Sequence, residues 1–423
     1  MARQGSRMSE WQQAWPDEVG VRLARELFQN SFAVPPDGVW ASPGRVNLIG
    51  EHTDYNGGLC LPIALPHRTY VAASRRAGDG VRITTGLEDG RTWSGQLAQI
   101  APGSVSDWVA YCGGPAWALR EAGVDVPGFD VAIASCVPLG AGLSSSAAVE
   151  CAVGLALTHL AGVRQDADDA GRAWLAGMCV RAENEVAGAP TGGMDQAASL
   201  RTEARHALLL DCRDGSVEQV RFDLVDAGLE LLVIDTRASH SLADGQYGAR
   251  RASCDAAADA LGVPTLREVS DLDAALATLD DEVTRRRVRH VVTEIARVGE
   301  FVAAASADDW PGAGRLMNAS HDSLRDDYQV SCAELDVAVD AARSAGALGA
   351  RMTGGGFGGS AIALVPAAAA ETVAGAVLAA ARARGLVTPV IHRATPSAPG
   401  GCLIEPWRSP ATSPVQTQET SDE

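Results

Sequence analysis

Residues 44–58 read GRVNLIGEHTDYNGG, an apolar strand that leads into a polar segment and ends in a glycine turn. We call this run the first motif. Its arginine, asparagine, glutamate, histidine and aspartate lie beside a segment that the apolar pattern predicts to be buried. Buried polar groups are costly unless they have hydrogen-bonding partners. The first motif therefore indicates a site for a polar ligand, and a polyhydroxylated molecule would supply the partners.

A second run, the glycine-serine loop, reads PLGAGLSSSAA at residues 138–148. It follows a short apolar strand at 129–134, and the residues after it, 147–157, are small and apolar on nearly every side, which predicts a buried helix. The first turn of a helix points free N–H groups and a positive dipole end at an anion, and glycines let the backbone approach it. The loop therefore fits the phosphates of a nucleotide, although the three serines could also serve only to cap the helix.

The composition excludes several classes of phosphate-transferring and amine-dependent enzymes. All 35 basic residues are arginine, and the chain contains no lysine. A Walker-type phosphate loop, a protein-kinase fold and a Schiff-base mechanism each need a lysine. The formal net charge of −18 also argues against nucleic acid and anionic membrane surfaces as partners.

Nine cysteines are scattered along the chain without a C-x-x-C pair, several of them inside apolar runs. This distribution favours buried thiols of a reducing compartment over a metal site or a disulfide framework. No apolar run reaches the roughly 18–20 residues that a membrane span needs, and the N-terminus lacks the apolar core of a signal peptide. We therefore expect a cytoplasmic protein.

The length of 423 residues suits two lobes, because single cores stop growing at about 250–300 residues. An amphipathic pattern predicts a helix at 17–32, and β-branched runs with glycine turns predict antiparallel strands between 70 and 94. Strands that alternate with helices in the second half predict an α/β or split βαβ lobe. The expected divisions are a flexible tail at 1–15, an N-terminal sugar- and nucleotide-binding lobe at 16–225, a C-terminal lobe at 226–406 and a disordered tail at 407–423.

The first motif, the glycine-serine loop and a third run, MTGGGFGG at 352–359, resemble the motifs of the galactokinases in sequence and order. The galactokinases belong to the GHMP family of small-molecule kinases. The resemblance extends from about residue 43 to about 400, and three blocks in one order are far more specific than a single glycine-rich loop. It implies an α+β fold with a mixed-sheet N-terminal lobe, an α/β ferredoxin-like C-terminal lobe and an active site in the cleft between them. The implied reaction is direct transfer of the γ-phosphate of ATP to the anomeric hydroxyl of galactose, with ATP as co-substrate and Mg²⁺ as cofactor.

The resemblance also assigns residues to ATP and to the metal ion. The ATP-binding residues that it implies are Gly140, Ala141, Gly142, Leu143, Ser144, Ser145 and Ser146. Ser146 matches the family's magnesium ligand and Glu183 its acidic ligand, and Mg²⁺ prefers few protein oxygens beside phosphate and water. Helix geometry places Glu183 and Glu185 about 200° apart, so only one of them can face the site. As an isolated observation, Glu183 would more often be a solvated helix residue.

Asp195 matches the family's catalytic aspartate, which would accept or steer the proton of the attacking hydroxyl. Arg45 matches the arginine beside that aspartate, which would keep Asp195 ionised and offset charge on the transferred phosphoryl group. Without the resemblance, Asp195 also reads as the N-cap of a helical turn at 196–200, and Arg45 reads as a surface residue.

For the sugar, the resemblance implies contacts from Glu51, His52, Thr53, Asp54, Asp195 and Tyr247. Thr53 would contribute through its backbone. A carboxylate binds a pair of hydroxyls well, and a site built on such bonds rejects an epimer by leaving its own groups unpaired. A histidine beside a glutamate is by itself more often structural.

Three further features have open roles. The glycine run at 354–359 would let the C-terminal lobe close over the site. The segment SHDSLRDDY at 320–328 also resembles the family, but its chemistry assigns it no role. Trp108 would border either the adenine or the core.

Other functions stay open on the sequence. The same chemistry could act on another sugar, such as N-acetylgalactosamine or arabinose, because residues outside the motifs decide that choice. A non-catalytic regulator could bind galactose and ATP without turnover, but such relatives depart from the phosphate-loop motif, which is intact here at Ser146. A nucleotide-binding domain without a reaction would leave the polar cluster of the first motif unexplained. We expect galactose and ATP as partners, no nucleic acid or membrane, and a monomer.

Overall fold

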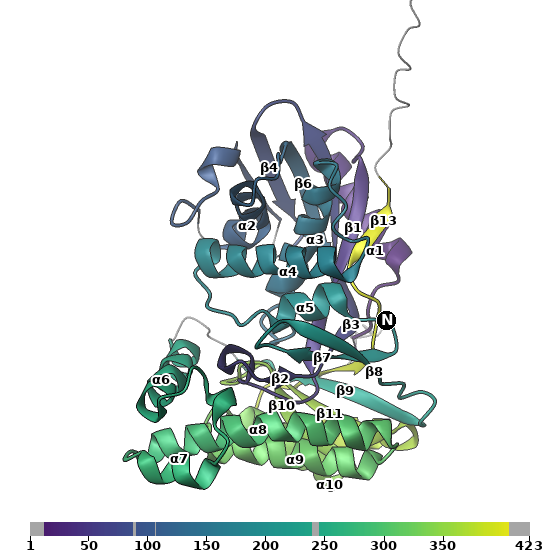
Figure 1. The fold of residues 1–423 in the computed structure, drawn as a ribbon. Coiled ribbons are helices and arrows are strands. Elements are labelled where there is room, and N and C mark those ends of the chain that lie inside the picture. The colour runs from purple at the N-terminus through teal and green to yellow at the C-terminus, as the bar shows by residue number, and fades with distance from the viewer. Residues whose placement is uncertain (1–11, 88–89, 106, 239–244, 406–423) are drawn as a thin grey trace, which may run out of the picture.

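The computed structural model describes residues 12–87, 90–105, 107–238 and 245–405, which form two lobes (Figure 1). The predicted tail at 407–423 and most of the predicted tail at 1–15 lie outside the described residues. Among the described helices, none combines the length and the apolar character that crossing a membrane requires. The cytoplasmic location stays a prediction.

The N-terminal lobe is built on a six-stranded sheet in the order β13-β1-β3-β6-β4-β5. Neighbouring strands are antiparallel except β4 and β6, which run parallel, so the sheet is mixed as predicted. Its strands are β1 (Gly38–Asn47), β3 (Pro62–Arg76), β4 (Gly80–Thr85), β5 (Arg91–Gln96), β6 (Gly128–Ser135) and β13 (Gly401–Ile404).

Helices cover both faces of this sheet. On one face, α1 (Asp17–Phe32) buries Ala24, Phe28 and Phe32, which recur at helical spacing as the sequence predicts. The other face shares a core with α2 (Trp108–Glu121), α3 (Ser145–Leu160) and α4 (Asp169–Arg181). Every residue of α3 from Ala147 to Leu160 is buried. A helix that is apolar on all sides is stable only inside the protein, so the N-terminus of α3 starts within the molecule.

A smaller sheet lies between this lobe and the C-terminal lobe, next to α5 (Met194–Arg201) (Figure 1). Its strand order is β2-β7-β8, with all neighbours antiparallel. The strands are β2 (Leu59–Cys60), β7 (His206–Asp211) and β8 (Ser216–Arg221).

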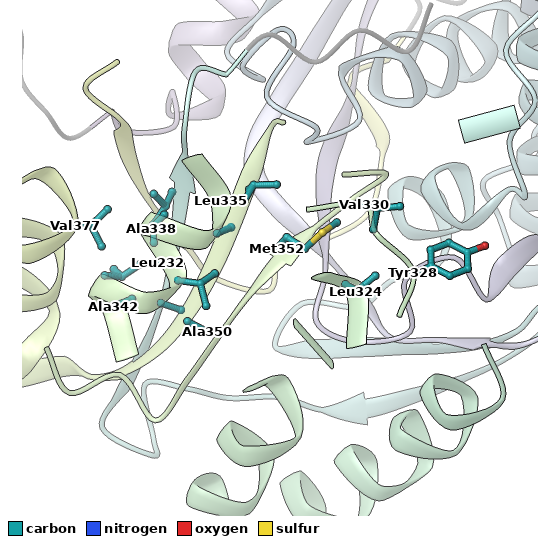
Figure 2. Close-up of a cluster of buried hydrophobic side chains, with 14 of the residues drawn as sticks. Leu232, Leu324, Tyr328, Val330, Leu335, Ala338, Ala342, Ala350, Met352 and Val377 are labelled. Carbon is teal, nitrogen blue, oxygen red and sulfur yellow. The ribbon is translucent and has the colours of Figure 1, made fainter. Parts of the chain in front are cut away.

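The C-terminal lobe holds a four-stranded antiparallel sheet in the order β10-β11-β9-β12. Its strands are β9 (Leu229–Asp235), β10 (Gly349–Thr353), β11 (Ser360–Pro366) and β12 (Val390–Ala394). Its helices are α6 (Gln246–Leu261), α7 (Leu272–Thr278), α8 (Glu282–Ser306), α9 (Trp310–Asp326), α10 (Ala333–Ser344) and α11 (Ala370–Ala383). Figure 2 shows part of its core, where Leu232 of β9 packs in one cluster with Leu335 of α10 and Val377 of α11. The order of strands and helices is the split βαβ arrangement, which confirms the predicted ferredoxin-like lobe.

One strand departs from the predicted lobe ranges. β13 falls within the predicted C-terminal range 226–406, but it pairs with β1 at the edge of the N-terminal sheet, where Cys402 lies opposite Trp40. A strand of four residues carries too little pattern to reveal its distant partner. The boundary near residue 226 stays a prediction.

Candidate active site

A cavity of about 910 Å³ lies where the three motifs, the loop before α5 and the first turn of α6 come together. The predicted site residues that line it are Arg45, Glu51, His52, Asp54, Gly140, Gly142, Leu143, Ser144, Ser145, Ser146, Glu183, Asp195 and Tyr247. Thr53 and Ala141 are buried behind this lining. The Thr53 hydroxyl bonds to the backbone carbonyls of Gly50 and Leu59, and the Ala141 carbonyl accepts a hydrogen bond from Ser360.

Arg45 and Asp195 form a two-pronged ion pair on the cavity wall. The Nε of Arg45 donates to Asp195 Oδ1 at 2.7 Å, and its Nη2 donates to Oδ2 at 2.8 Å. The remaining Nη1 donates to the carbonyl of Gly142 at 2.8 Å. Burial opposes the charge of Arg45, but its attraction to Asp195 outweighs burial and raises the pKa of the guanidinium above its ordinary value. The pair thus joins the first motif to α5 and to the glycine-serine loop.

Asp195 is the second residue of α5, and Gly193 occupies the N-cap position. The alternative interpretation of Asp195 as the helix N-cap is therefore wrong. The hydroxyl of Ser144 donates to the Oδ2 of Asp195 and makes no capping bond to α3, although Ser144 is the N-cap residue there. The Asp195 side chain keeps 21% of its surface exposed, so this clamped carboxylate can still reach a ligand.

The glycine-serine loop brings the N-terminus of α3 to the cavity. Gly44 of the first motif lies so close to the loop that a Cβ there would meet the Leu143 carbonyl at 2.6 Å. The N–H of Arg45 donates to the same carbonyl at 3.1 Å. This close approach holds the loop in place while the first N–H groups of α3 stay available to an anion.

Glu183 lies in a π-helical turn, Ala182–Ala187, that follows α4, and it lines the cavity. Glu185 instead pairs with Arg181 at 3.0 Å, with 45% of its side chain exposed. The two glutamates thus face different ways, as helix geometry requires. Gln196, which no motif indicates, donates its Nε2 to the Glu183 carboxylate at 2.6 Å.

The surroundings of Glu183 are electrostatically suited to a cation. Burial, followed by repulsion from Asp195, raises the pKa of Glu183 to about 7, while a hydrogen bond from Ser146 acts in the opposite direction. Burial also raises the pKa of the fully enclosed Glu150 on α3, and the charge of Glu183 adds to this effect. Carboxyl groups gathered in this way favour a positive ion among them. A carboxylate beside a hydroxyl is an oxygen donor set that fits Mg²⁺.

Glu51 is buried, and protein donors take up most of its carboxylate. Its Oε1 accepts from the Gly354 N–H at 2.8 Å and from the Thr353 hydroxyl at 3.1 Å. Its Oε2 accepts from Asn47 Nδ2 at 2.9 Å. Because each carboxylate oxygen has two lone pairs, Oε2 keeps capacity for one ligand hydroxyl.

His52 has a left-handed backbone, with φ of 62°, and its ring is already hydrogen-bonded on both sides. Nδ1 lies 2.8 Å from the Tyr55 hydroxyl, and Nε2 lies 3.1 Å from the Gly355 carbonyl. A carbonyl only accepts, so this network assigns the proton to Nε2 and makes Nδ1 the acceptor. Burial lowers the pKa of His52 to about 3, so the ring is neutral at physiological pH. A sugar hydroxyl can bond to His52 only by displacing one of these partners.

Asp54 and Tyr247 approach the cavity from different lobes. Asp54 begins the short 3₁₀ turn Asp54–Asn56, and Tyr247 lies in the first turn of α6, with its ring centroid 5.4 Å from that of His52. Burial, followed by the charge of Asp195, raises the pKa of Asp54 to about 6. Trp108, whose role the sequence left open between the adenine and the core, lines the cavity and also packs against the core of the N-terminal lobe. Sequence reasoning missed other cavity-lining residues, because they belong to separate elements without a shared motif: Thr85, Leu87, Arg91, Asp107 and Tyr111.

Three family models match the chain. The galactokinase galactose-binding signature matches residues 26–75, the N-terminal domain of the GHMP kinases matches 110–203, and their C-terminal domain matches 301–383. These ranges contain, in order, the first motif, the glycine-serine loop and the third motif.

Whole-chain comparisons agree with these matches. The galactokinase of Streptomyces coelicolor is 52% identical over 383 residues, which cover 90% of this chain and 97% of the relative. The crystal structure of Lactococcus lactis galactokinase complexed with galactose has a TM-score of 0.83 at 31% identity, and the match covers 90% of this chain and 98% of that one. A mevalonate kinase structure at 16% identity, with a TM-score of 0.58 over 87% of this chain and 99% of that one, is similar in fold alone. The chain therefore belongs to the galactokinases of the GHMP kinase family, and it phosphorylates galactose with ATP.

Proposed function

We propose that the enzyme transfers the γ-phosphate of ATP directly to the anomeric hydroxyl of galactose, with Asp195 and Arg45 as its catalytic residues. The observation that carries this proposal is the clamped carboxylate: Asp195 is held by two prongs of Arg45 and by Ser144 on the cavity wall. A carboxylate fixed in this way can accept or steer the proton of a hydroxyl within hydrogen-bonding distance. No covalent intermediate is needed, because positioning two substrates in one cavity can lower the barrier by roughly 7–11 kcal/mol.

Arg45 has a second task in this scheme. Its Nη1 bond to Gly142 places the guanidinium beside the loop that we assign to the phosphates. Positive charge at this point offsets the negative charge that develops on the transferred phosphoryl group. The free N–H groups at the start of α3 add to this charge, so the phosphates can be bound in a chain without lysine.

We assign the Mg²⁺ site to Ser146 and Glu183. When bound there, the ion would neutralise phosphate charge and help to orient the γ-phosphate. The raised pKa of Glu183, caused first by burial, supports this assignment, because a cation would favour the ionised carboxylate. Gln196 keeps that carboxylate directed, since its amide donates to Glu183 at 2.6 Å.

We assign the galactose hydroxyls to Glu51, Asp54 and Tyr247, with His52 beside them. The open lone pair on Glu51 Oε2 supports a hydroxyl contact at that atom. The bond of His52 to the Gly355 carbonyl supports a different role for the histidine, because it joins the first motif to the glycine run of the third.

The test measures ADP release from Mg·ATP with galactose, glucose, N-acetylgalactosamine and arabinose, for the wild type and for Asp195→Asn. Asparagine keeps the shape of the side chain and removes its basic oxygen, so galactose turnover should fall by about 10²–10⁴-fold while calorimetry finds ADP binding unchanged. The matched control is Asp169→Asn, because Asp169 forms a similar two-pronged pair with Arg201 away from the cavity. Unchanged turnover in Asp195→Asn would contradict the catalytic assignment. If only another sugar were turned over, the catalytic assignment of Asp195 would stand, but the proposed galactose contacts would be wrong.

We further propose that the enzyme acts as a monomer in the cytoplasm and does not bind nucleic acid. The free thiol state of the nine cysteines supports the cytoplasmic location, and the net charge of −18 argues against nucleic acid. Light scattering coupled to gel filtration tests the monomer, and a mass of twice 43.8 kDa or more would refute it.

A further inference from the structure

Arg351 links the C-terminal lobe to the first motif. It lies in the middle of β10, directly before the third motif, and its side chain is fully buried. Its Nε donates to the Ser320 hydroxyl of α9 at 3.1 Å. Its Nη1 donates to the Asn47 carbonyl at 3.0 Å and to Glu51 Oε1 at 3.4 Å. Ser320 opens the segment 320–328, to which the sequence alone assigned no role.

Glu294 of α8 completes this buried network. Its Oε1 accepts from the N–H of Gly50 at 3.0 Å and from the Ser320 hydroxyl at 2.6 Å, and it lies 3.9 Å from Arg351 Nη2. Burial favours the neutral acid, but the basic side chains around Glu294 outweigh burial and hold its pKa below the ordinary value. Glu294 therefore holds the backbone of the first motif directly and orients Arg351 through Ser320.

The donors around Glu51 are distributed unevenly between its two oxygens. Oε1 receives Arg351, Thr353 and Gly354, which are consecutive or nearly so at the end of β10. Among the described residues, only Asn47 donates to Oε2. One oxygen is thus anchored to the C-terminal lobe, and the other keeps a lone pair for a ligand hydroxyl.

We infer that Arg351 is a positioning residue for the galactose site: through the network with Ser320 and Glu294 it sets the direction of the Glu51 carboxylate from the C-terminal lobe. This inference rests on the proposed contact between Glu51 and the sugar. Removing one partner of a buried charged network leaves the others uncompensated, so Glu51 without Arg351 would turn or lose its fixed direction. The loss should appear in sugar binding before it appears in nucleotide binding, because no Arg351 bond reaches the glycine-serine loop among the described contacts.

The test compares Arg351→Met, Arg351→Lys and Ser320→Ala with the wild type, using calorimetric galactose binding and steady-state kinetics on proteins shown by circular dichroism to be folded. We expect Arg351→Met to raise the Kd and the KM for galactose by about tenfold or more, with the KM for ATP changed by less than about twofold. Lysine keeps the charge but loses the forked geometry, so the galactose Kd of Arg351→Lys should lie between the values of the wild type and of Arg351→Met. Ser320→Ala should also weaken galactose binding, but by less than Arg351→Met does.

The matched control is Arg343→Met. Arg343 of α10 also donates to the strand beside the network, at the Ala350 carbonyl, but it does not contact the first motif in the described structure. Its loss should leave the galactose Kd within about twofold of the wild type, which separates positioning of Glu51 from general damage to β10.

A double-mutant cycle with Glu51→Gln decides whether the arginine acts through the carboxylate. If it does, Arg351→Met added to Glu51→Gln weakens galactose binding no further than Glu51→Gln alone. Additive losses, or an equal loss of ATP affinity, would overturn the inference. If Arg351→Met does not fold, the same cycle with Ser320→Ala gives the decision. Unchanged galactose affinity in Glu51→Gln itself would instead remove the proposed sugar contact, and the inference with it.

Discussion

Gly192 sits against Asp54 so closely that it offers a sharp test of the sugar site. A Cβ at position 192 would lie 2.2 Å from Asp54 Oδ2 and 2.6 Å from its Cγ. Ordinary contacts of a Cβ begin near 3.4 Å, so Gly192→Ala forces the carboxylate to retreat by roughly 1 Å, a displacement that can cost about 10²-fold in rate. We therefore expect kcat/KM for galactose to fall by about 10²-fold, equivalent to roughly 2.7 kcal/mol.

The assay is ADP release at varied galactose, then at varied ATP, with urea unfolding to confirm that the variant is folded. The KM for ATP should stay within about twofold of the wild type, because the steric conflict is with a carboxylate that we assign to the sugar. Gly248→Ala is the matched control: Gly248 also lines the cavity, but a Cβ there meets no heavy atom within 4 Å. The reasoning would be refuted if Gly192→Ala left kcat/KM for galactose unchanged, or if both variants lowered it equally.

Two further predictions concern the metal ion and pH. Ser146→Ala should raise the Mg²⁺ concentration for half-maximal rate by about tenfold while leaving metal-free ADP binding unchanged, and an equal Mg²⁺ requirement in both proteins would contradict the assignment. Burial lowers the pKa of His67 and of His392 to about 4 from the ordinary 6.5, with the His392 charge a further cause for His67. As pH falls, the unfolded chain therefore binds protons at these two histidines before the folded chain does. The free energy of unfolding decreases between pH 6.5 and pH 4, by up to about 1.4 kcal/mol per pH unit for each histidine. His392→Leu should make this loss shallower by about that amount in urea unfolding at several pH values, so parallel curves would show the shift to be absent.

The sequence was most informative where chemistry and local structure coincide. The strand, glycine loop and buried helix around residues 129–157 could be predicted from pattern alone, because a helix made mostly of small apolar side chains is stable only in the interior. The meeting of Arg45 with Asp195, 150 residues apart, could be expected only through the resemblance to a family. No periodicity or spacing brings such distant residues together.

Other parts of the site depend on contacts that a sequence does not display. The ring of His52 is hydrogen-bonded to the carbonyl of Gly355, 303 residues away. The motif predicted where His52 lies in the sequence, but no sequence pattern could predict this distant partner. Arg351 lies in a fully buried strand, where an arginine signals only that some partner must exist. The wall around Trp108 comes from several elements whose packing decides what faces the cavity.

The pairing of β13 with β1 has a consequence for how the chain is made. β1 begins at Gly38, but its outer neighbour consists of residues 401–404. At roughly 5–20 residues per second, the ribosome needs on the order of 20–70 seconds to pass from one to the other. During that time the edge of the N-terminal sheet is open, and an unpaired strand edge is a template for pairing with another chain. The strand at 401–404 therefore closes this edge only after almost four hundred residues have been made, and a chain cut short before residue 401 would leave that edge exposed to aggregation.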